Sequence, residues 1–135
     1  MLALTRSSLR WAALPLLAAS LVGCATLPQP FSQIDGHKYH PVPINTYSVQ
    51  IVRVDGRDSL DSPTFVEPGV RQVTVQGPPD GVHRFGEQRT MELNVAPCTR
   101  YYLVAVKPNR LLSDFSIKID HEEPIGGCSS AVAAK

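Results

Sequence analysis

The chain has 135 residues, with 13 Lys and Arg side chains against 12 Asp and Glu side chains, so its formal net charge is +1. A chain of this length forms one domain, because two hydrophobic cores of ordinary size need more residues. The near-balance of charge excludes the strongly basic class of nucleic-acid-binding proteins, so we expect no nucleic acid among the partners.

The first residues have the pattern of an export signal. Arg6 and Arg10 precede an apolar run from Trp11 to Val22, and no acidic residue interrupts the segment. The run is about a dozen residues long, whereas a helix that crosses a bilayer needs roughly 20. A buried helix is the alternative, but it would need a polar face, and the run carries only Ser20. We therefore predict a cleaved signal peptide over residues 1–23.

The signal ends in Leu21-Val22-Gly23-Cys24, which resembles the lipobox of bacterial lipoproteins. In that family the cysteine receives a diacylglycerol and becomes the first residue after cleavage. The resemblance implies lipid attachment at Cys24. Because Ala25 follows instead of an aspartate, it also implies anchoring in the outer membrane, facing the periplasm. Several acyl chains hold a protein more firmly than one does. The alternative is a soluble secreted protein with Cys24 in its mature domain.

Cleavage before Cys24 leaves 112 of the 135 residues, and the loss of two arginines leaves eleven basic against twelve acidic side chains. Residues 24–43 carry four prolines and no apolar period, which predicts an extended tether between the lipid and the domain. We place a single domain at residues 44–128 and a flexible tail at residues 129–135.

Five segments of the predicted domain have the pattern of β-strands, with β-branched or alternating apolar side chains. They are residues 48–54, 70–76, 91–95, 101–106 and 115–119. The segment 101–106 is an almost unbroken apolar run, as expected of a strand that is buried on both faces. Turn sequences such as Asp55-Gly56 separate the segments, and no window has a helical period. The predicted fold class is all-β, a small antiparallel β-sandwich or barrel-like domain.

Two cysteines remain once Cys24 is assigned to the lipid. Cys98 and Cys128 have no His or Cys neighbour at ligand spacing, which argues against a metal site or a nucleophile. Exported proteins can keep disulfides, so we predict that these two cysteines pair. A bridge that closes about 30 residues stabilises a domain by roughly 3–4 kcal/mol in the chain-entropy model. It would hold the C-terminal segment against the body of the sandwich.

The turns and strands also resemble those of small β-sandwich modules of exported bacterial proteins, such as PEGA-type and carboxypeptidase-regulatory-like modules. The shared element is the Pro68-Gly69 turn before an alternating strand, followed by the Tyr101-Tyr102 strand. Such modules bind or position other molecules, so the resemblance implies a binding role.

Two histidine-bearing segments lie at opposite ends of the mature chain. His37 and His40 follow Asp35, and His121 precedes Glu122-Glu123. A zinc or copper site needs three or four ligands in fixed geometry, and nothing beside the first pair completes such a set. We expect surface histidines, no metal and no cofactor.

Catalytic groups have no recognisable arrangement in the sequence. There is no G-x-S-x-G elbow, and the four histidines are scattered. The carboxylate pairs Asp58 with Asp61, Glu87 with Glu92, and Glu122 with Glu123 could act as acid and base in a cleft, although such pairs are more often solvated. We expect no catalytic residue and no enzyme.

A binding surface of arginines and tyrosines is the remaining candidate. Arg84, Arg89 and Arg100 flank the loop from Gln76 to Gln88 and the turn before Tyr101-Tyr102, and both residue types are enriched at binding hot spots. The aromatic side chains that could support a glycan are Tyr47, Phe85, Tyr101 and Tyr102.

Together these features predict a lipid-anchored binding or accessory component of the cell envelope. Its partners would be the membrane, through the lipid, and an envelope protein or a cell-wall component. The alternative is a periplasmic protein that binds a small ligand, a glycan or a metal.

Overall fold

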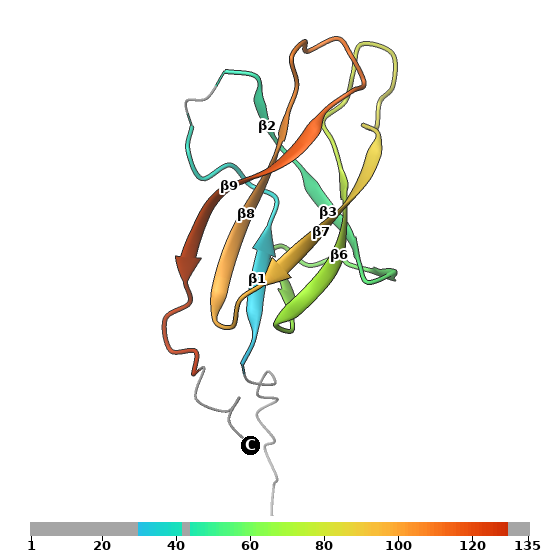
Figure 1. The fold of residues 1–135 in the computed structure, drawn as a ribbon. Helices are drawn as coiled ribbons and strands as arrows, with labels where there is room; N and C mark the ends of the chain where they lie inside the picture. Colours follow the sequence, from blue (N-terminus) through green and yellow to red (C-terminus); the bar gives the residue numbers. More distant parts are fainter. Residues whose placement is uncertain (1–29, 42–43, 130–135) are drawn as a thin grey trace, which may run out of the picture.

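Nine strands make up the regular structure of the computed structural model, which describes residues 30–41 and 44–129 (Figure 1). They are β1 (Ser32–Asp35), β2 (Thr46–Ser48), β3 (Gln50–Val54), β4 (Arg57–Asp58), β5 (Thr64–Val66), β6 (Gly69–Gln76), β7 (Gln88–Val95), β8 (Thr99–Val106) and β9 (Ser116–Pro124). None of the described residues is helical, and accordingly none belongs to a helix long and apolar enough to cross a membrane. The predicted all-β class is confirmed.

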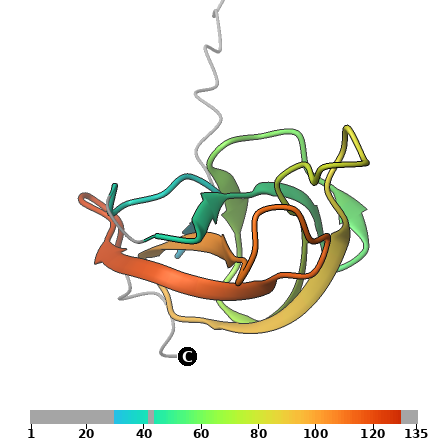
Figure 2. The same cartoon turned by 90° about the horizontal axis from the view of Figure 1, so that it is seen from above.

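The strands form two sheets around one core. The first sheet is centred on β8, which pairs with β9 along one edge and with β1 and β2 along the other, and β5 extends it beyond β1. The second sheet has the order β4-β3-β6-β7 and is antiparallel throughout. The pairing of β1 with β8 is parallel. Seen from above, the two sheets curve around the interior, which gives the sandwich a barrel-like outline (Figure 2).

Alternate positions of the long strands build the core. The buried cluster contains Ile34, Ile51, Val66, Val73, Val75, Leu93, Val95, Tyr101, Leu103, Ala105 and Phe115. Full burial of a large aliphatic side chain stabilises a fold by about 1.5–3 kcal/mol. The hydroxyl of Tyr101 accepts a hydrogen bond from the N–H of Ala96 at 2.9 Å, so its polar end is satisfied inside the core. Residues 101–105 are all buried, which confirms that β8 is covered on both faces.

The domain begins earlier than the sequence predicts. Residues 24–43 were expected to form a tether, but Ser32–Asp35 are strand β1 between β5 and β8, and this expectation is wrong for them. Ser32 and Ile34 are fully buried, and the Ser32 hydroxyl donates to the carbonyl of Ala96 at 2.6 Å. A strand of four residues with one apolar side chain has too little pattern to be recognised, because its partners determine its conformation.

The five predicted strands are all present. They correspond to β3, β6, β7, β8 and β9, most of them longer by a few residues than predicted. The other four strands have two to four residues each, too few to show a period.

The two ends of the sandwich differ in what they carry (Figure 1). The start of β1 and the end of β9, beside which the described residues begin and end, lie at one end, which we call the proximal end. The β6–β7 loop (residues 77–87) and the β8–β9 loop (residues 107–115) lie at the other, the distal end. The predicted signal peptide, the lipid-attachment residue Cys24 and residues 130–135 of the predicted tail lie outside the described residues.

Candidate functional site

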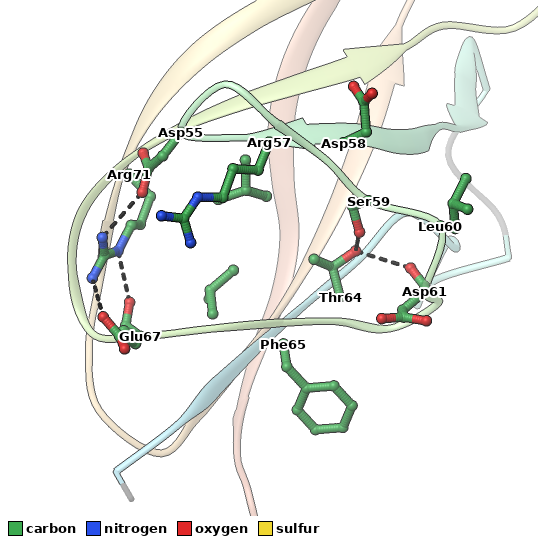
Figure 3. A pocket seen from close by; sticks show the side chains of 12 residues that line it. Asp55, Arg57, Asp58, Ser59, Leu60, Asp61, Thr64, Phe65, Glu67 and Arg71 are labelled. Carbon is green, nitrogen blue, oxygen red and sulfur yellow. Dashed lines mark hydrogen bonds and ion pairs between the residues drawn. The ribbon is translucent and has the colours of Figure 1, made fainter. Parts of the chain in front are cut away.

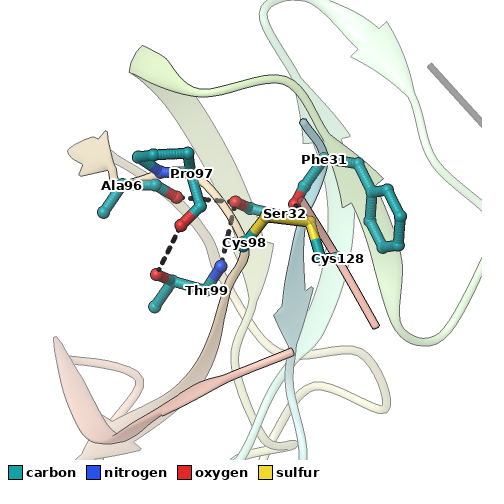
Figure 4. The surroundings of a disulfide bond; sticks show 7 residues. All are labelled: Phe31, Ser32, Ala96, Pro97, Cys98, Thr99 and Cys128. Carbon is teal, nitrogen blue, oxygen red and sulfur yellow. Dashed lines mark hydrogen bonds between the residues drawn. A yellow bond between two sulfur atoms is a disulfide. The ribbon is translucent and has the colours of Figure 1, made fainter. Parts of the chain in front are cut away.

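A disulfide bond closes the proximal end of the sandwich (Figure 4). Cys98, in the turn before β8, is bonded to Cys128, which follows β9, with an S–S distance of 2.07 Å. The N–H of Cys98 donates to the carbonyl of Phe31 at 3.1 Å, and its carbonyl accepts the N–H of Ile125 at 2.8 Å. The predicted pairing is confirmed. It fixes the C-terminal segment beside the start of β1.

The fold brings the two histidine-bearing segments together on the outer face of the first sheet. The ring of Tyr39 stacks on the ring of His121, with centroids 3.8 Å apart and an angle of 12°. The His40 ring lies edge-on to both of these rings, and the ring centroid of Tyr102 lies 5.0 Å from that of Tyr39. We call Tyr39, His40, Tyr102 and His121 the aromatic cluster.

A β-bulge in β9 positions this cluster. Tyr102 pairs with His121 and Leu103 pairs with Ile119, so Asp120 is the extra residue between them. Its carboxylate accepts the N–H groups of Tyr39 and His40, each at 2.9 Å. Burial raises the pKa of Asp120, but the hydrogen bonds from these two N–H groups outweigh burial and hold the pKa below its ordinary value.

An ion pair lies beside Tyr102 of the aromatic cluster. The guanidinium of Arg100 contacts the carboxylate of Asp35 at 2.5 Å and lies over the ring of Tyr102, 5.0 Å from its centroid. The Tyr102 hydroxyl donates to Glu123 at 2.6 Å. Burial and this hydrogen bond raise the pKa of Tyr102 to about 12. Burial also raises the pKa of Asp35. Hydrogen bonds from the His37 N–H, Arg100 and the His37 ring outweigh burial and bring this pKa below its ordinary value.

The aromatic cluster mainly fixes the connection between β1 and β2. His37 contacts Asp35 while His40 contacts Asp120, so the two histidines have separate partners. Across residues 30–41 and 44–129, no three His, Cys, Asp or Glu side chains come together as metal ligands.

The predicted arginine and tyrosine surface does not form. Arg100 pairs with Asp35 on the first sheet, whereas Arg89 pairs with Glu87 and Asp114 beside the distal loops. Tyr101 and Tyr102 are buried, so neither offers an exposed ring to a glycan. Phe85 remains exposed in the β6–β7 loop.

An open cleft lies where the two sheets have free edges (Figure 3). β4 is the edge of the second sheet, β5 is the edge of the first, and the chain between them surrounds a space of about 490 Å³. The lining residues are Val54, Asp55, Arg57, Asp58, Ser59, Leu60, Asp61, Thr64, Phe65, Val66, Glu67 and Arg71. We call this space the edge cleft.

Most charges of the edge cleft are paired within the protein. Arg71 contacts Asp55 at 3.0 Å and Glu67 at 3.5 Å, and Asp58 contacts Arg53 at 3.0 Å. The two exceptions are Arg57 and Asp61, whose side chains make no ion pair or hydrogen bond with any residue that the structure describes.

The two unpaired charges of the edge cleft are well placed to meet a bound molecule. Figure 3 shows the Arg57 guanidinium reaching into the edge cleft, with Asp61 at the other end of the cleft. Leu60, which is 95% exposed, and Phe65 add apolar surface. One free cation, one free carboxylate and two apolar side chains can recognise a chain of mixed polarity.

The edge cleft has no pairing of a nucleophile with a histidine among its lining residues. None of its lining residues is a histidine or a cysteine, and the Ser59 hydroxyl shares a hydrogen bond of 2.8 Å with the Thr64 hydroxyl. The Ser59 hydroxyl therefore has no histidine among the lining residues that could act as its base. Sequence reasoning singled out Asp58 and Asp61 but missed Arg57 and Phe65, because β4 and β5 are too short to be recognised.

Comparisons of the chain with protein-family models, with curated proteins and with solved structures found no match. Function is therefore inferred from the residues of this chain alone.

Proposed function

We propose that the protein is an exported, lipid-anchored binding component of the bacterial cell envelope, attached to the outer membrane through Cys24 and facing the periplasm. The observation that supports this proposal is that export accounts for every cysteine of the chain. Cys24 ends the lipobox, and the other two form a disulfide, a bond that persists in oxidising compartments. No catalytic activity is proposed.

The position of Cys24 would keep the domain close to the bilayer. Pro30, where the described structure begins, is six positions after Cys24, and six positions span at most about 22 Å even when fully extended. Such an anchor raises the effective concentration of the domain for partners in or near the membrane. An accessory role follows, in which the protein holds a partner at the membrane.

The edge cleft is the binding site in this proposal, and its ligand is an extended segment of an envelope protein that carries charges of both signs. The Arg57 guanidinium would bind a carboxylate with two parallel hydrogen bonds, and Asp61 would accept a hydrogen bond from a cation. Leu60 and Phe65 would cover apolar side chains of the same segment. The free edges of β4 and β5 leave the cleft open along its length for such a segment.

A small zwitterionic ligand is the second candidate. The volume of the edge cleft, about 490 Å³, lies within the range of small-molecule sites, and the same two charges would bind it. Binding of a small ligand can be measured with the isolated protein and that ligand alone. Binding of a partner segment is detected only where the envelope protein that carries the segment is present.

The test is photo-crosslinking in cells from position 60, followed by affinity purification and mass spectrometry. We expect one envelope protein to be captured, and we expect Arg57→Glu to reduce its recovery at least tenfold. Lys118→Glu is the matched control, since it makes the same charge change on the exposed side of β9 and should leave recovery unchanged. A Cys24→Ala form with a soluble export signal should recover less partner, because the anchor no longer concentrates it.

Two outcomes would contradict partner binding. If no specific protein is captured with the wild-type chain, the partner proposal fails and calorimetry with small zwitterions becomes the next assay. If Arg57→Glu and Lys118→Glu behave alike, the partner does not use the edge cleft.

A further inference from the structure

The distal end of the sandwich exposes an unusual amount of apolar surface. In the β6–β7 loop Val82 and Phe85 are 85% and 74% exposed, and in the β8–β9 loop Leu111 and Leu112 are 70% and 50% exposed. The two loops touch, because a Cβ atom at Gly81 would lie 3.6 Å from the Leu111 side chain. Figures 1 and 2 show both loops side by side at the end opposite the start of β1. We call these four apolar side chains and their two loops the distal tip.

The acidic groups of the distal tip are engaged within the protein. The carboxylate of Asp80 accepts the N–H groups of Val82 and His83, and its side chain is only 5% exposed. Glu87 and Asp114 both contact Arg89, at 3.3 and 2.6 Å. The carboxylates near the tip therefore have internal partners.

The basic groups of the distal tip differ in this respect. The side chains of Arg84 and Arg110 make no hydrogen bond or ion pair with the residues described in the structure. They lie in the same two loops as the exposed apolar side chains. The tip thus presents phenylalanine, leucine and valine together with two guanidinium groups that have no partner among the described residues.

We propose that the distal tip docks on a lipid bilayer that contains anionic headgroups. Aromatic and aliphatic side chains enter the boundary between headgroups and acyl chains, and arginines bind the anionic headgroups that surround them. The shape of the tip fits a bilayer better than a protein groove, because the apolar side chains stand on two protruding loops. The docking does not require the lipid on Cys24 and is independent of the edge cleft.

The experiment is cosedimentation of the exported chain with vesicles. The chain carries Cys24→Ala and a soluble export signal, so that no lipid contributes, and it keeps every described residue. One set of vesicles contains equal parts of phosphatidylglycerol and phosphatidylcholine, and the other contains phosphatidylcholine alone. We expect at least tenfold stronger partitioning into the anionic vesicles, with a loss of binding in high salt.

Variants separate the distal tip from other exposed apolar positions. Phe85→Ser with Leu111→Ser should weaken binding to the anionic vesicles at least tenfold, and Arg84→Glu with Arg110→Glu should do the same. Val70→Ser is the matched control, because Val70 is 59% exposed in β6, outside both loops, and should change binding less than twofold. Unchanged thermal unfolding of each variant shows that the fold is retained.

Two results would overturn the proposal. One is equal binding of the wild-type chain to both kinds of vesicle. The other is equal binding of the Phe85→Ser, Leu111→Ser variant and the wild-type chain to anionic vesicles. Neither result bears on lipid attachment at Cys24, which this chain lacks by design.

Discussion

At the scale of single residues, the interior of the sandwich holds a buried ammonium group. The Lys107 side chain is 1% exposed, and its Nζ atom has no hydrogen-bond partner within the described part of the chain. A buried charge that is not paired costs several kcal/mol of folding free energy. The backbone N–H of Lys107 donates to the carbonyl of Asn45 at 2.9 Å, so this hydrogen bond fixes the backbone at Lys107 independently of the side chain.

Lys107→Met should therefore stabilise the protein. Methionine keeps most of the methylene contacts and removes the charge, so we expect the free energy of unfolding in urea to rise by about 1–3 kcal/mol. Lys118→Met, at an exposed position of β9, is the control and should change it by less than about 0.5 kcal/mol. A loss of stability in Lys107→Met would show that the ammonium group has a favourable partner.

The ion pair of Asp35 with Arg100 should make stability depend on acid pH. The native pKa of Asp35 lies below its ordinary value of 3.8, so the pair contributes in full above about pH 5 and is lost as the pH falls through the native pKa. Asp35→Asn should cost about 2–3 kcal/mol at pH 7, and this difference should shrink towards pH 2.

Urea unfolding of wild type and Asp35→Asn at several pH values measures this effect. Arg100→Met and the double variant complete a mutant cycle. The free energy of unfolding should fall less in the double variant than the sum of the losses in the two single variants. A difference that stays constant between pH 7 and pH 2 would contradict the assigned role of the carboxylate.

At the scale of secondary-structure elements, the sequence predicts the long strands and misses the short ones. β6 and β7 have alternating patterns, and β8 is an apolar run, so local side chains alone identify them. The two residues of β4 and the three of β5 have no period, and the four of β1 carry a single apolar side chain. Their pairing with β3, β1 and β8 determines them, and no local pattern records such pairing.

The candidate sites were hidden from sequence reasoning for the same reason. Tyr39 and His40 meet His121 because β1 and β9 lie on opposite edges of β8, a relation that depends on the topology. The edge cleft depends on two strands that were not predicted. The pairing of Cys98 with Cys128 could be predicted, because only two cysteines remain after Cys24 is assigned.

The disulfide should stabilise the proximal end through the loop that it closes. It joins residues 30 positions apart, so replacing both cysteines by serine should lower the free energy of unfolding by about 3–4 kcal/mol. A reductant should lower the stability of the wild-type protein by a similar amount and leave the serine variant unchanged. Two free thiols in the isolated wild-type protein would contradict the assignment.

At the scale of the whole molecule, the two ends of the sandwich would face different surroundings. The proximal end, with the disulfide and Pro30, lies nearest to the proposed anchor, while the distal tip is at the opposite end (Figure 1). With both proposals in place, the lipid anchor and the bilayer-docking tip would lie at opposite ends of the domain.

Lipid attachment at Cys24 underlies the proposed function, and the intact mass of protein purified from cell membranes measures it. We expect a chain that begins at Cys24, carries a diacylglycerol on that residue and contains one disulfide. The Cys24→Ala form with a soluble export signal should leave the membrane fraction. A mass that corresponds to the uncleaved chain, or to a cleaved chain without lipid, would contradict the account.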